Sequence, residues 1–317
     1  MGWSGSITSE SVFGTSITFT PSTTTEGAYT VSTFTAPVKG IYRFQLYGSG
    51  GTKWGSGNED LVRNDCGGAD GGAGGYTDGY LLLEQGQTVY VGAGGKCSAA
   101  FVSKTTGSKL SAITQENLYF VAGGGGAGSS WYDSVNKSGW NCKATAGSAG
   151  GGVEGATMTG EYSTYTGSPG TQTAGGAAGY AAGEGVASKA GSYGTGGAPG
   201  GGTGSKYGAY AGRGGDGLYG GGGGHAQVED NAGRAGGGGG GSGYVATANL
   251  TVGGTTYTST TSQGGGAATD TTGSVVVTYH APETAEIPIV YNGTKIEKLI
   301  FNGTEVTSVI YNGTKLF

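Results

Sequence analysis

Four segments of this chain are poor in glycine and carry its best candidates for recognition chemistry: 52–66, 129–143, 160–168 and 225–235. The candidate receptor-binding residues in and beside them are Trp54, Asp60, Trp131, Tyr132, Asp133, Trp140, Tyr162 and Tyr165. Aromatic rings bury the C–H faces of sugars, and carboxylates accept hydrogen bonds from hydroxyl groups. The segments therefore predict a binding surface for a host glycan or a protein. The alternative is that these aromatic residues cover the ends of glycine helices and form a core there.

The sequence offers no catalytic motif, and we expect neither a metal nor a cofactor. His225 and His280 are the only histidines, and neither has a nucleophile motif or a second ligand nearby. Gly-x-Gly-x-x-Gly arises by chance in a chain with 76 glycines among 317 residues, so it does not indicate a dinucleotide site. The segment 212–219 is close to a calcium-binding repeat but is a single copy, which favours a turn role for Asp216. A glycan-active enzyme is the weakest hypothesis, supported only by the scattered carboxylates of Glu59, Asp60, Asp133 and Glu154.

The elements that position these segments must be built largely from backbone, because glycine runs such as 220–224 and 236–241 supply no side chains. Ordering glycine costs more entropy than ordering any other residue, so backbone hydrogen bonds have to offset that cost. Polyproline II helices leave every N–H and C=O free to bond with neighbouring helices. The glycines lack the fixed three-residue period of collagen. We therefore predict a bundle of polyglycine helices, in which Gly222 and Gly239 are structural positions intolerant of a Cβ.

The rest of the chain reads as β structure, because β-branched and aromatic runs bounded by glycine recur and amphipathic helix periods are missing. Strands are expected at 29–35, 41–47, 80–84, 88–91, 117–122, 244–252 and 274–280. The last is far from the first, which makes the glycine-rich stretch an insertion between strands of one sandwich. The expected domains are an attachment arm (1–27), the glycine-rich domain (28–282) and a C-terminal module (283–317).

Composition also restricts the partners of the chain. The formal charge of −5 argues against nucleic acid as a partner. The chain contains no run of eighteen apolar residues, so we expect no membrane insertion. The first residues lack the basic and apolar regions of a signal peptide. The three cysteines, Cys66, Cys97 and Cys142, allow either one disulfide with a free thiol or three free thiols.

The C-terminal module repeats the triplet Asn-Gly-Thr at ten-residue intervals, after Tyr291, Phe301 and Tyr311. Asn-Gly is the strongest short signal for a two-residue hairpin turn. Turns at these three places predict a four-stranded antiparallel meander with one apolar face. The cross-strand row of that face, and the predicted assembly residues, are Ile289, Ile296, Val309 and Leu316. Such a face must pack on the sandwich or on another subunit, and we favour a homotrimer.

Glycine-containing motifs follow one another in a defined order along the chain, at 34–51, 74–76, 86–95, 120–128, 170–176 and 220–224. This ordered series resembles the glycine-rich domain of the anaplastic lymphoma kinase and leukocyte tyrosine kinase receptors, and the resemblance covers about residues 28–281. It implies an all-β fold, a tumour-necrosis-factor-like jelly roll with an inserted polyglycine II helix bundle. Receptor signalling is not implied, because the chain has no kinase region and no membrane span.

The tail and the composition suggest a different setting for that domain. Asn-Gly-Thr hairpins resemble C-terminal modules of bacterial and phage surface proteins, and glycine-rich bundles occur in adhesins at phage tail-fibre tips. We expect a non-enzymatic tail or tail-fibre protein that binds the host surface, together with other tail proteins, in the virion and outside the cell after release. The alternative is a structural or adhesive protein of the bacterial surface or matrix.

Overall fold

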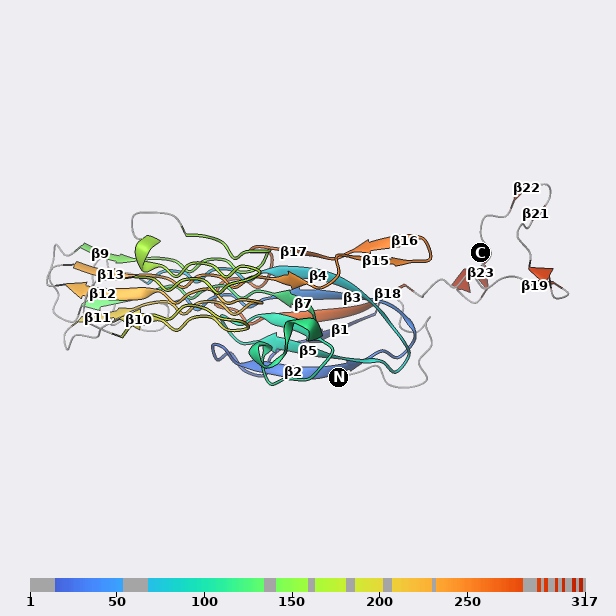
Figure 1. Cartoon of the computed structure of the whole chain (residues 1–317), viewed down its shortest axis with the longest axis horizontal. Helices are drawn as coiled ribbons and strands as arrows, with labels where there is room; N and C mark the ends of the chain where they lie inside the picture. Colours follow the sequence, from blue (N-terminus) through green and yellow to red (C-terminus); the bar gives the residue numbers. More distant parts are fainter. Residues whose placement is uncertain are drawn as a thin grey trace.

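The computed structural model describes residues 15–53, 68–133, 141–158, 163–180, 186–201, 207–229 and 232–281, and six two-residue strands between 290 and 315. Over these residues the fold is all-β, and the helices are single 3-10 turns. The predicted fold class is thus confirmed. A β-sandwich, a bundle of glycine-rich segments and the end strands of that bundle follow one another along the long axis (Figure 1).

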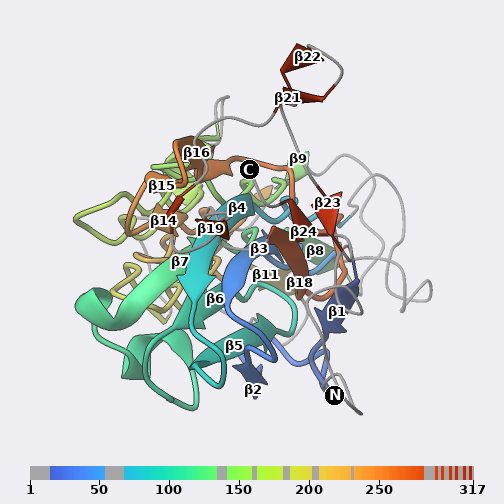
Figure 2. The same cartoon turned by 90° about the vertical axis from the view of Figure 1, so that its right-hand side faces the viewer.

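Two five-stranded sheets form the sandwich, and neighbouring strands in both are antiparallel. The first sheet has the order β1 (Ser16–Phe19), β18 (Ser274–Ala281), β3 (Gly40–Tyr47), β4 (Tyr76–Leu83) and β17 (Thr260–Ser262). The second has the order β14 (Tyr244–Val245), β7 (Leu118–Ala122), β6 (Ala100–Ser103), β5 (Thr88–Gly94) and β2 (Tyr29–Thr35). Figure 2 shows them as two layers seen along the long axis.

Strand alternation explains the core between the two sheets. In β3 every second residue points inward, so Tyr42, Phe44 and Leu46 are fully buried. Phe34 of β2 meets the rings of Tyr42 and Phe44 at centroid distances of 5.4 and 6.0 Å. Phe44 also meets Phe120 of β7 at 6.2 Å. Both sheets therefore contribute rings to one apolar core.

A second apolar cluster covers the outer face of the second sheet. Phe101, Leu118 and Val121 point away from the first core and are fully buried. The 3-10 turns η2 (Leu110–Ala112) and η3 (Gln115–Asn117) lie between β6 and β7, and Leu110 packs into this cluster. Leu218, from the glycine-rich insertion, completes it. The insertion is thereby attached to the sandwich by side chains as well as by backbone.

Several predicted boundaries differ from the observed strands. The predicted strand 244–252 is divided into β14 and β15 (Asn249–Val252), because β15 turns back through Gly253 and Gly254 to pair with β16 (Thr255–Thr258). Both glycines have positive φ, of 57° and 79°, which the tight turn requires. In addition, β1 lies within the segment predicted as an arm, and it pairs with β18.

The glycine-rich insertions leave the sandwich at one end (Figure 1). They connect β3 to β4 (48–75), β7 to β14 (123–243) and β17 to β18 (263–273). Backbone hydrogen bonds join the three insertions near the sandwich, since the amide of Gly75 donates to Gly123 and that of Gly74 to Ala267. We call the hydrogen-bonded segments within these three insertions the glycine bundle.

Hydrogen bonding in the glycine bundle repeats every third residue. Within 220–224, the first and fourth amides donate to 189–192, and the second and fifth donate to 212–215. The third amide donates to the carbonyl of Ser168. The segment therefore has three neighbours and three residues per turn, which is the geometry of a polyproline II-type helix. This pattern supports the predicted polyglycine helices.

A Cβ has no room at the two glycines singled out from the sequence. At Gly222 it would overlap the carbonyl oxygen of Ala177, and at Gly239 it would overlap that of Ser168, far inside any real contact distance for a Cβ. The obstacle at both positions is backbone, which cannot rotate away as a side chain can. The predicted structural role of both glycines therefore has a direct geometric reason.

The C-terminal repeats form three hairpins: β19 (Val290–Tyr291) with β20 (Thr294–Lys295), β21 (Ile300–Phe301) with β22 (Thr304–Glu305), and β23 (Ile310–Tyr311) with β24 (Thr314–Lys315). Each pair flanks one Asn-Gly, so the predicted turns and their register are correct. The residues that would join the hairpins into one four-stranded meander, 296–299 and 306–309, lie outside the described residues, so the meander stays a prediction. Ile289, Ile296, Val309 and Leu316 lie outside the described residues.

Candidate functional site

Two small sheets close the glycine bundle at the end remote from the sandwich (Figure 1). One has the order β10 (Gly200–Gly201), β12 (His225–Glu229), β13 (Ala232–Ala235) and β9 (Asn141–Ala144). The other pairs β11 (Tyr207–Tyr210) with β8 (Ser130–Asp133). Together with the 3-10 turn η4 (Ser163–Tyr165) and the adjacent residues Tyr180 and Val186, they are called the tip below.

Three of the glycine-poor segments meet at this end of the molecule, and the described flanks of the fourth lie beside them. The segment 129–143 contributes β8 and β9, 225–235 contributes β12 and β13, and 160–168 contributes η4. The flanks of the fourth segment, 52–66, lie beside the start of β8. There the amide of Gly128 donates to Thr52 at 2.9 Å, and the amide of Ala69 donates to Ser129 at 2.8 Å. Segments far apart in the sequence thus leave the glycine bundle at the same place.

The predicted binding residues differ in how much of each is described by the structure. Trp131, Tyr132 and Asp133 are consecutive in β8, at positions paired with Ala209, Gly208 and Tyr207 of β11. Their side chains lie outside the described part of the chain, as do the whole residues Trp54, Asp60, Trp140 and Tyr162.

Tyr165 is the predicted residue whose surroundings are described in full. It is half-buried in η4, and its hydroxyl donates a hydrogen bond to Gln227 Oε1 at 2.9 Å. The same hydroxyl accepts a hydrogen bond from Arg234 Nη1 at 2.9 Å. The guanidinium carbon of Arg234 lies 5.7 Å from the ring centroid. Tyr165 is therefore part of a polar cluster at the surface, not of an apolar core.

Sequence reasoning missed other residues of the tip. Tyr180 is 71% exposed, and its amide donates to the carbonyl of Thr164, next to Tyr165. Val186 is 69% exposed beside β10, and Tyr210 of β11 is exposed as well. These residues lie in glycine-rich stretches, where a search for glycine-poor segments does not find them. Large apolar side chains held in solvent by a rigid scaffold are typical of binding surfaces.

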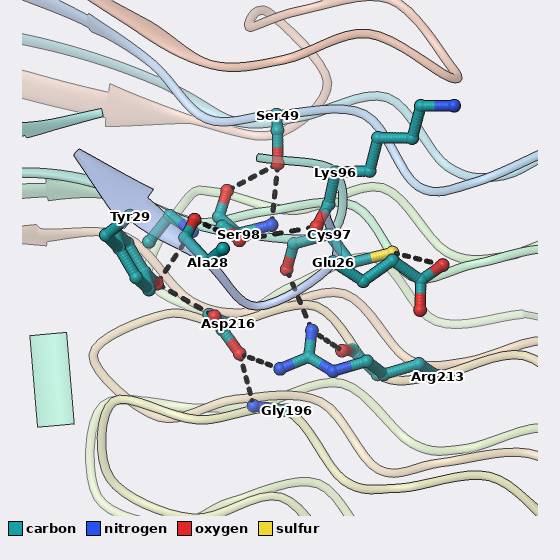
Figure 3. A network of polar contacts seen from close by, with 12 residues as sticks. Glu26, Ala28, Tyr29, Ser49, Lys96, Cys97, Ser98, Gly196, Arg213 and Asp216 are labelled. Atoms are coloured by element: carbon teal, nitrogen blue, oxygen red, sulfur yellow. Dashed lines mark hydrogen bonds and ion pairs between the residues drawn. The ribbon is translucent and has the colours of Figure 1, made fainter. Parts of the chain in front are cut away.

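A buried polar network joins the glycine bundle to the sandwich (Figure 3). Asp216 accepts hydrogen bonds from Arg213 Nη2 at 2.6 Å, from the Tyr29 hydroxyl at 2.8 Å and from the amide of Gly196 at 2.7 Å. Its side chain is 2% exposed. The expected turn role for Asp216 is therefore wrong, because the buried Arg213 needs a carboxylate partner at this position. Burial and the neighbouring Asp216 carboxylate raise the pKa of Tyr29 well above its ordinary value.

The described cysteine belongs to the same junction. Cys97 is free and fully buried, with its sulfur 3.8 Å from a carboxylate oxygen of Glu26. Burial, aided by the Glu26 charge, raises the pKa of the Cys97 thiol to about 12. A thiol with such a pKa stays protonated and unreactive at neutral pH. Cys66 and the side chain of Cys142 lie outside the described residues, so the pairing question stays open for them.

The two histidines, His225 and His280, have different surroundings in the fold. His225 is buried at the start of β12, and burial lowers its pKa. His280 of β18 packs against Tyr80 and Tyr257 on the outer face of the first sheet, at centroid distances of 5.3 and 5.5 Å. Across the described residues, no three His, Cys, Asp or Glu side chains converge as a metal site would require.

No protein-family model matches the chain, and no curated protein is significantly similar to it. Within the described residues, no helix is both long and apolar enough to span a membrane. Function is therefore inferred from the site itself.

Proposed function

We propose that this protein is an adhesin of a phage tail or tail fibre, which binds a glycan or a protein on the host surface through the tip. The observation that carries the proposal is that glycine-poor segments from distant parts of the chain, which include Trp131, Tyr132 and Tyr165, meet at one end of a scaffold held by backbone hydrogen bonds. Loops on a rigid scaffold are the usual place for recognition residues. The protein works by binding, without turnover.

The construction of the glycine bundle supports that role. Its segments are hydrogen-bonded to neighbours in three directions, so the scaffold itself need not reorganise when the tip binds. The loops can also change in sequence without disturbing the scaffold, because the scaffold is held by backbone groups. An adhesin that must follow a changing host surface needs this separation between a constant frame and variable loops.

We assign the domain to the same group as the glycine-rich domain of the anaplastic lymphoma kinase and leukocyte tyrosine kinase receptors. The insertion of a glycine bundle between strands of one sandwich supports that assignment. The phage setting, in the virion tail beside other tail proteins, rests on the Asn-Gly-Thr hairpins. The alternative is an adhesin or matrix protein of the bacterial surface.

Binding of fluorescently labelled protein to a panel of bacterial strains tests the proposal. We expect labelling of some strains only, and protection of those strains from a phage that carries the protein. Tyr180→Ala and Trp131→Ala should weaken labelling, since an aromatic anchor contributes about 2 kcal/mol or more to binding. Val153→Ala is the matched control, because Val153 is 68% exposed beside the sandwich. Equal labelling of all strains, or equal loss in the control, contradicts the proposal.

We further propose that the C-terminal hairpins assemble the protein into a homotrimer. In Figure 1 they lie apart from the sandwich, and the sequence predicts an apolar face containing Ile289 and Leu316. Such a face needs a partner to be shielded from water. Light scattering should give three chains for the whole protein and one folded chain after deletion of 287–317. A full-length monomer contradicts the trimer.

A further inference from the structure

We propose that the outer face of the first sheet binds an extended, uncharged glycan chain along strands β3 and β4. This site is separate from the tip, and its existence does not depend on adhesion there. Three observations on the same face carry the proposal. They are two clusters of aromatic rings in line along β4, an ion pair between the clusters that neutralises itself, and the hydroxyl groups of the neighbouring strands.

The outer face is built from three cross-strand pairs, because every second residue of β3 and β4 points away from the core. We call these six half-buried residues the outer strip: Arg43 with Tyr80, Gln45 with Asp78, and Tyr47 with Tyr76. The outer face of the second sheet differs, because the apolar side chains of Leu110, Ile113 and Leu218 pack over it. The outer strip instead keeps part of its polar and aromatic surface in solvent.

Aromatic rings gather at both ends of the outer strip. At the end beside the glycine bundle, the rings of Tyr47 and Tyr76 lie 5.1 Å apart. At the other end, the rings of Tyr80, Tyr257 and His280 lie at centroid distances of 5.3 to 5.5 Å from one another. Tyr257 comes from the β15–β16 hairpin, at the end of the sandwich remote from the glycine bundle (Figure 1). Four residues separate Tyr76 from Tyr80 on one strand, so the clusters are about 13 Å apart along β4.

The middle of the outer strip is polar but has no net charge. Arg43 donates to both carboxylate oxygens of Asp78, at 2.9 and 2.8 Å, so the two charges offset each other. The Arg43 side chain is still 34% exposed, and Gln45 donates to the Tyr76 hydroxyl at 2.9 Å. Carboxylate and amide oxygens have lone pairs for further hydroxyl donors, whereas a paired couple offers no excess charge to an ion. This arrangement favours an uncharged ligand rich in hydroxyl groups.

Ionisable groups beside the Arg43–Asp78 pair are held in their uncharged forms. Burial raises the pKa of the Tyr47 and Tyr80 hydroxyls above the ordinary value, so both keep a proton to donate. Burial, aided by the Arg43 charge, lowers the pKa of His280. Beyond Arg43, Thr278 of β18 and Ser16 of β1 continue the row with hydroxyl groups that bond each other at 2.8 Å. Hydroxyl and amide groups beside aromatic rings are the usual lining of a carbohydrate site.

The linear layout of the outer strip favours an extended glycan over a protein segment. A cellulose-type chain is extended and nearly flat, so its C–H faces can pack on both ring clusters while its hydroxyls bond Asp78 and Gln45 between them. An amylose-type chain coils and meets only one cluster. A protein interface has an apolar core, whereas every side chain of the outer strip is aromatic or polar.

Calorimetric titration of the full-length protein tests the site. The probes are cellohexaose, its coiled isomer maltohexaose, and a hexasaccharide of alternating glucuronic acid and N-acetylglucosamine. We expect cellohexaose to bind at least about tenfold more tightly than the other two, with an affinity that added salt leaves unchanged. Absence of cellohexaose binding, or equally tight binding of the coiled or the acidic probe, overturns the inference.

Variants at the two ends of the outer strip locate the bound chain. Tyr47→Ala and Tyr257→Ala each remove one ring and should weaken cellohexaose binding about tenfold. Tyr47→Phe and Tyr257→Phe keep the rings and should retain most of the affinity. Tyr90→Ala is the matched control, because Tyr90 is a half-buried tyrosine of β5 in the other sheet. Equal loss in that control overturns the site.

A variant at an exposed position separates recognition from folding. Thr260 of β17 is exposed and lies opposite Asp78, so Thr260→Arg extends a long side chain beside the outer strip without altering the packed rings. We expect a several-fold loss of cellohexaose affinity at an unchanged melting temperature. Unchanged binding in Thr260→Arg and in both alanine variants places the sugar elsewhere on the molecule and overturns the inference.

The remaining outcomes distinguish the site from a subunit contact and from adhesion. A changed molar mass of Tyr47→Ala or Tyr257→Ala, with unchanged cellohexaose binding, identifies the face as a protein contact and overturns the glycan site. These titrations use no cells. Failure to label any strain therefore contradicts adhesion and leaves the glycan site standing, whereas failure to bind cellohexaose overturns the glycan site and leaves adhesion standing.

Discussion

The sandwich and the glycine bundle are adjacent parts of one chain that are held together by different groups. In the sandwich, the ring of Phe44 meets those of Phe34 and Phe120 across the two sheets at 6.0 and 6.2 Å. In the glycine bundle, the amide of Gly239 donates to Gly222 at 2.9 Å, and its carbonyl accepts from Gly215 at 2.8 Å. Side chains fill the first interior and backbone fills the second.

This difference determines which substitutions each region tolerates. A side-chain core loses stability in proportion to the volume removed, and its neighbours relax in part. A backbone core fails when atoms are added, because a Cβ separates segments whose hydrogen bonds depend on close approach. Large-to-small changes should therefore be the sensitive ones in the sandwich, and small-to-large changes in the glycine bundle.

The largest effect is expected for Gly239→Val and Gly222→Val. Each Cβ overlaps a backbone carbonyl and displaces at least two hydrogen-bonded neighbours, and each lost bond costs about 1–3 kcal/mol. The free energy of unfolding should fall by about 5 kcal/mol or more, as measured by denaturant titration. The control is Gly254→Asn, where φ is positive and the space is open, and it should be nearly neutral. Unchanged melting of both valine variants would show that these runs are loose loops.

Phe44→Ala should have the next largest effect. Removal of this fully buried ring costs about 3–5 kcal/mol, through lost transfer free energy and the cavity left behind. Phe44→Leu, which keeps much of the volume, should recover most of that loss. Chemical denaturation measures both. If Phe44→Ala costs less than 1 kcal/mol, the sandwich is not held by its side-chain core.

Asp216→Asn probes the junction where the two kinds of interior meet. It leaves the buried Arg213 without a carboxylate, and breaking a buried pair costs about 3 kcal/mol or more. Glu84→Gln removes the exposed ion pair with Lys39 and should cost less than about 1 kcal/mol. The melting temperatures of the Asp216→Asn and Glu84→Gln variants measure this difference. Similar losses in the two variants would mean that the junction is open to solvent.

The smallest effect is expected from alkaline pH and concerns the sandwich. Burial, aided slightly by Tyr279 and opposed by a backbone hydrogen bond from Val38, raises the pKa of Tyr42 to about 12, whereas an unfolded tyrosine titrates near pH 10. The folded state therefore keeps a proton that the unfolded state loses, so this stabilisation is complete below pH 10 and decreases as pH rises toward 12. At pH 11 the loss should be about 1 kcal/mol, and Tyr42→Phe should remove it. An identical pH profile in the variant contradicts this account.

Some features followed from the sequence because their causes are local. The β-branched and aromatic run at 41–47 predicted a strand, Asn-Gly predicted each C-terminal turn, and the glycine runs predicted a backbone-bonded bundle. Each of these depends on a few neighbouring residues and on the steric limits of their own backbone.

Tertiary structure alone decided which distant segments meet. No local pattern relates Tyr165 to Arg234 or Tyr29 to Asp216, because the partners are 69 and 187 residues apart in the sequence and meet only through the path of the long insertion 123–243. The predicted turn at Asp216 failed for the same reason, since a buried guanidinium cannot be seen in the sequence. The residue types of the binding segments were therefore readable from the chain, whereas their gathering at the tip depended on the path of the backbone.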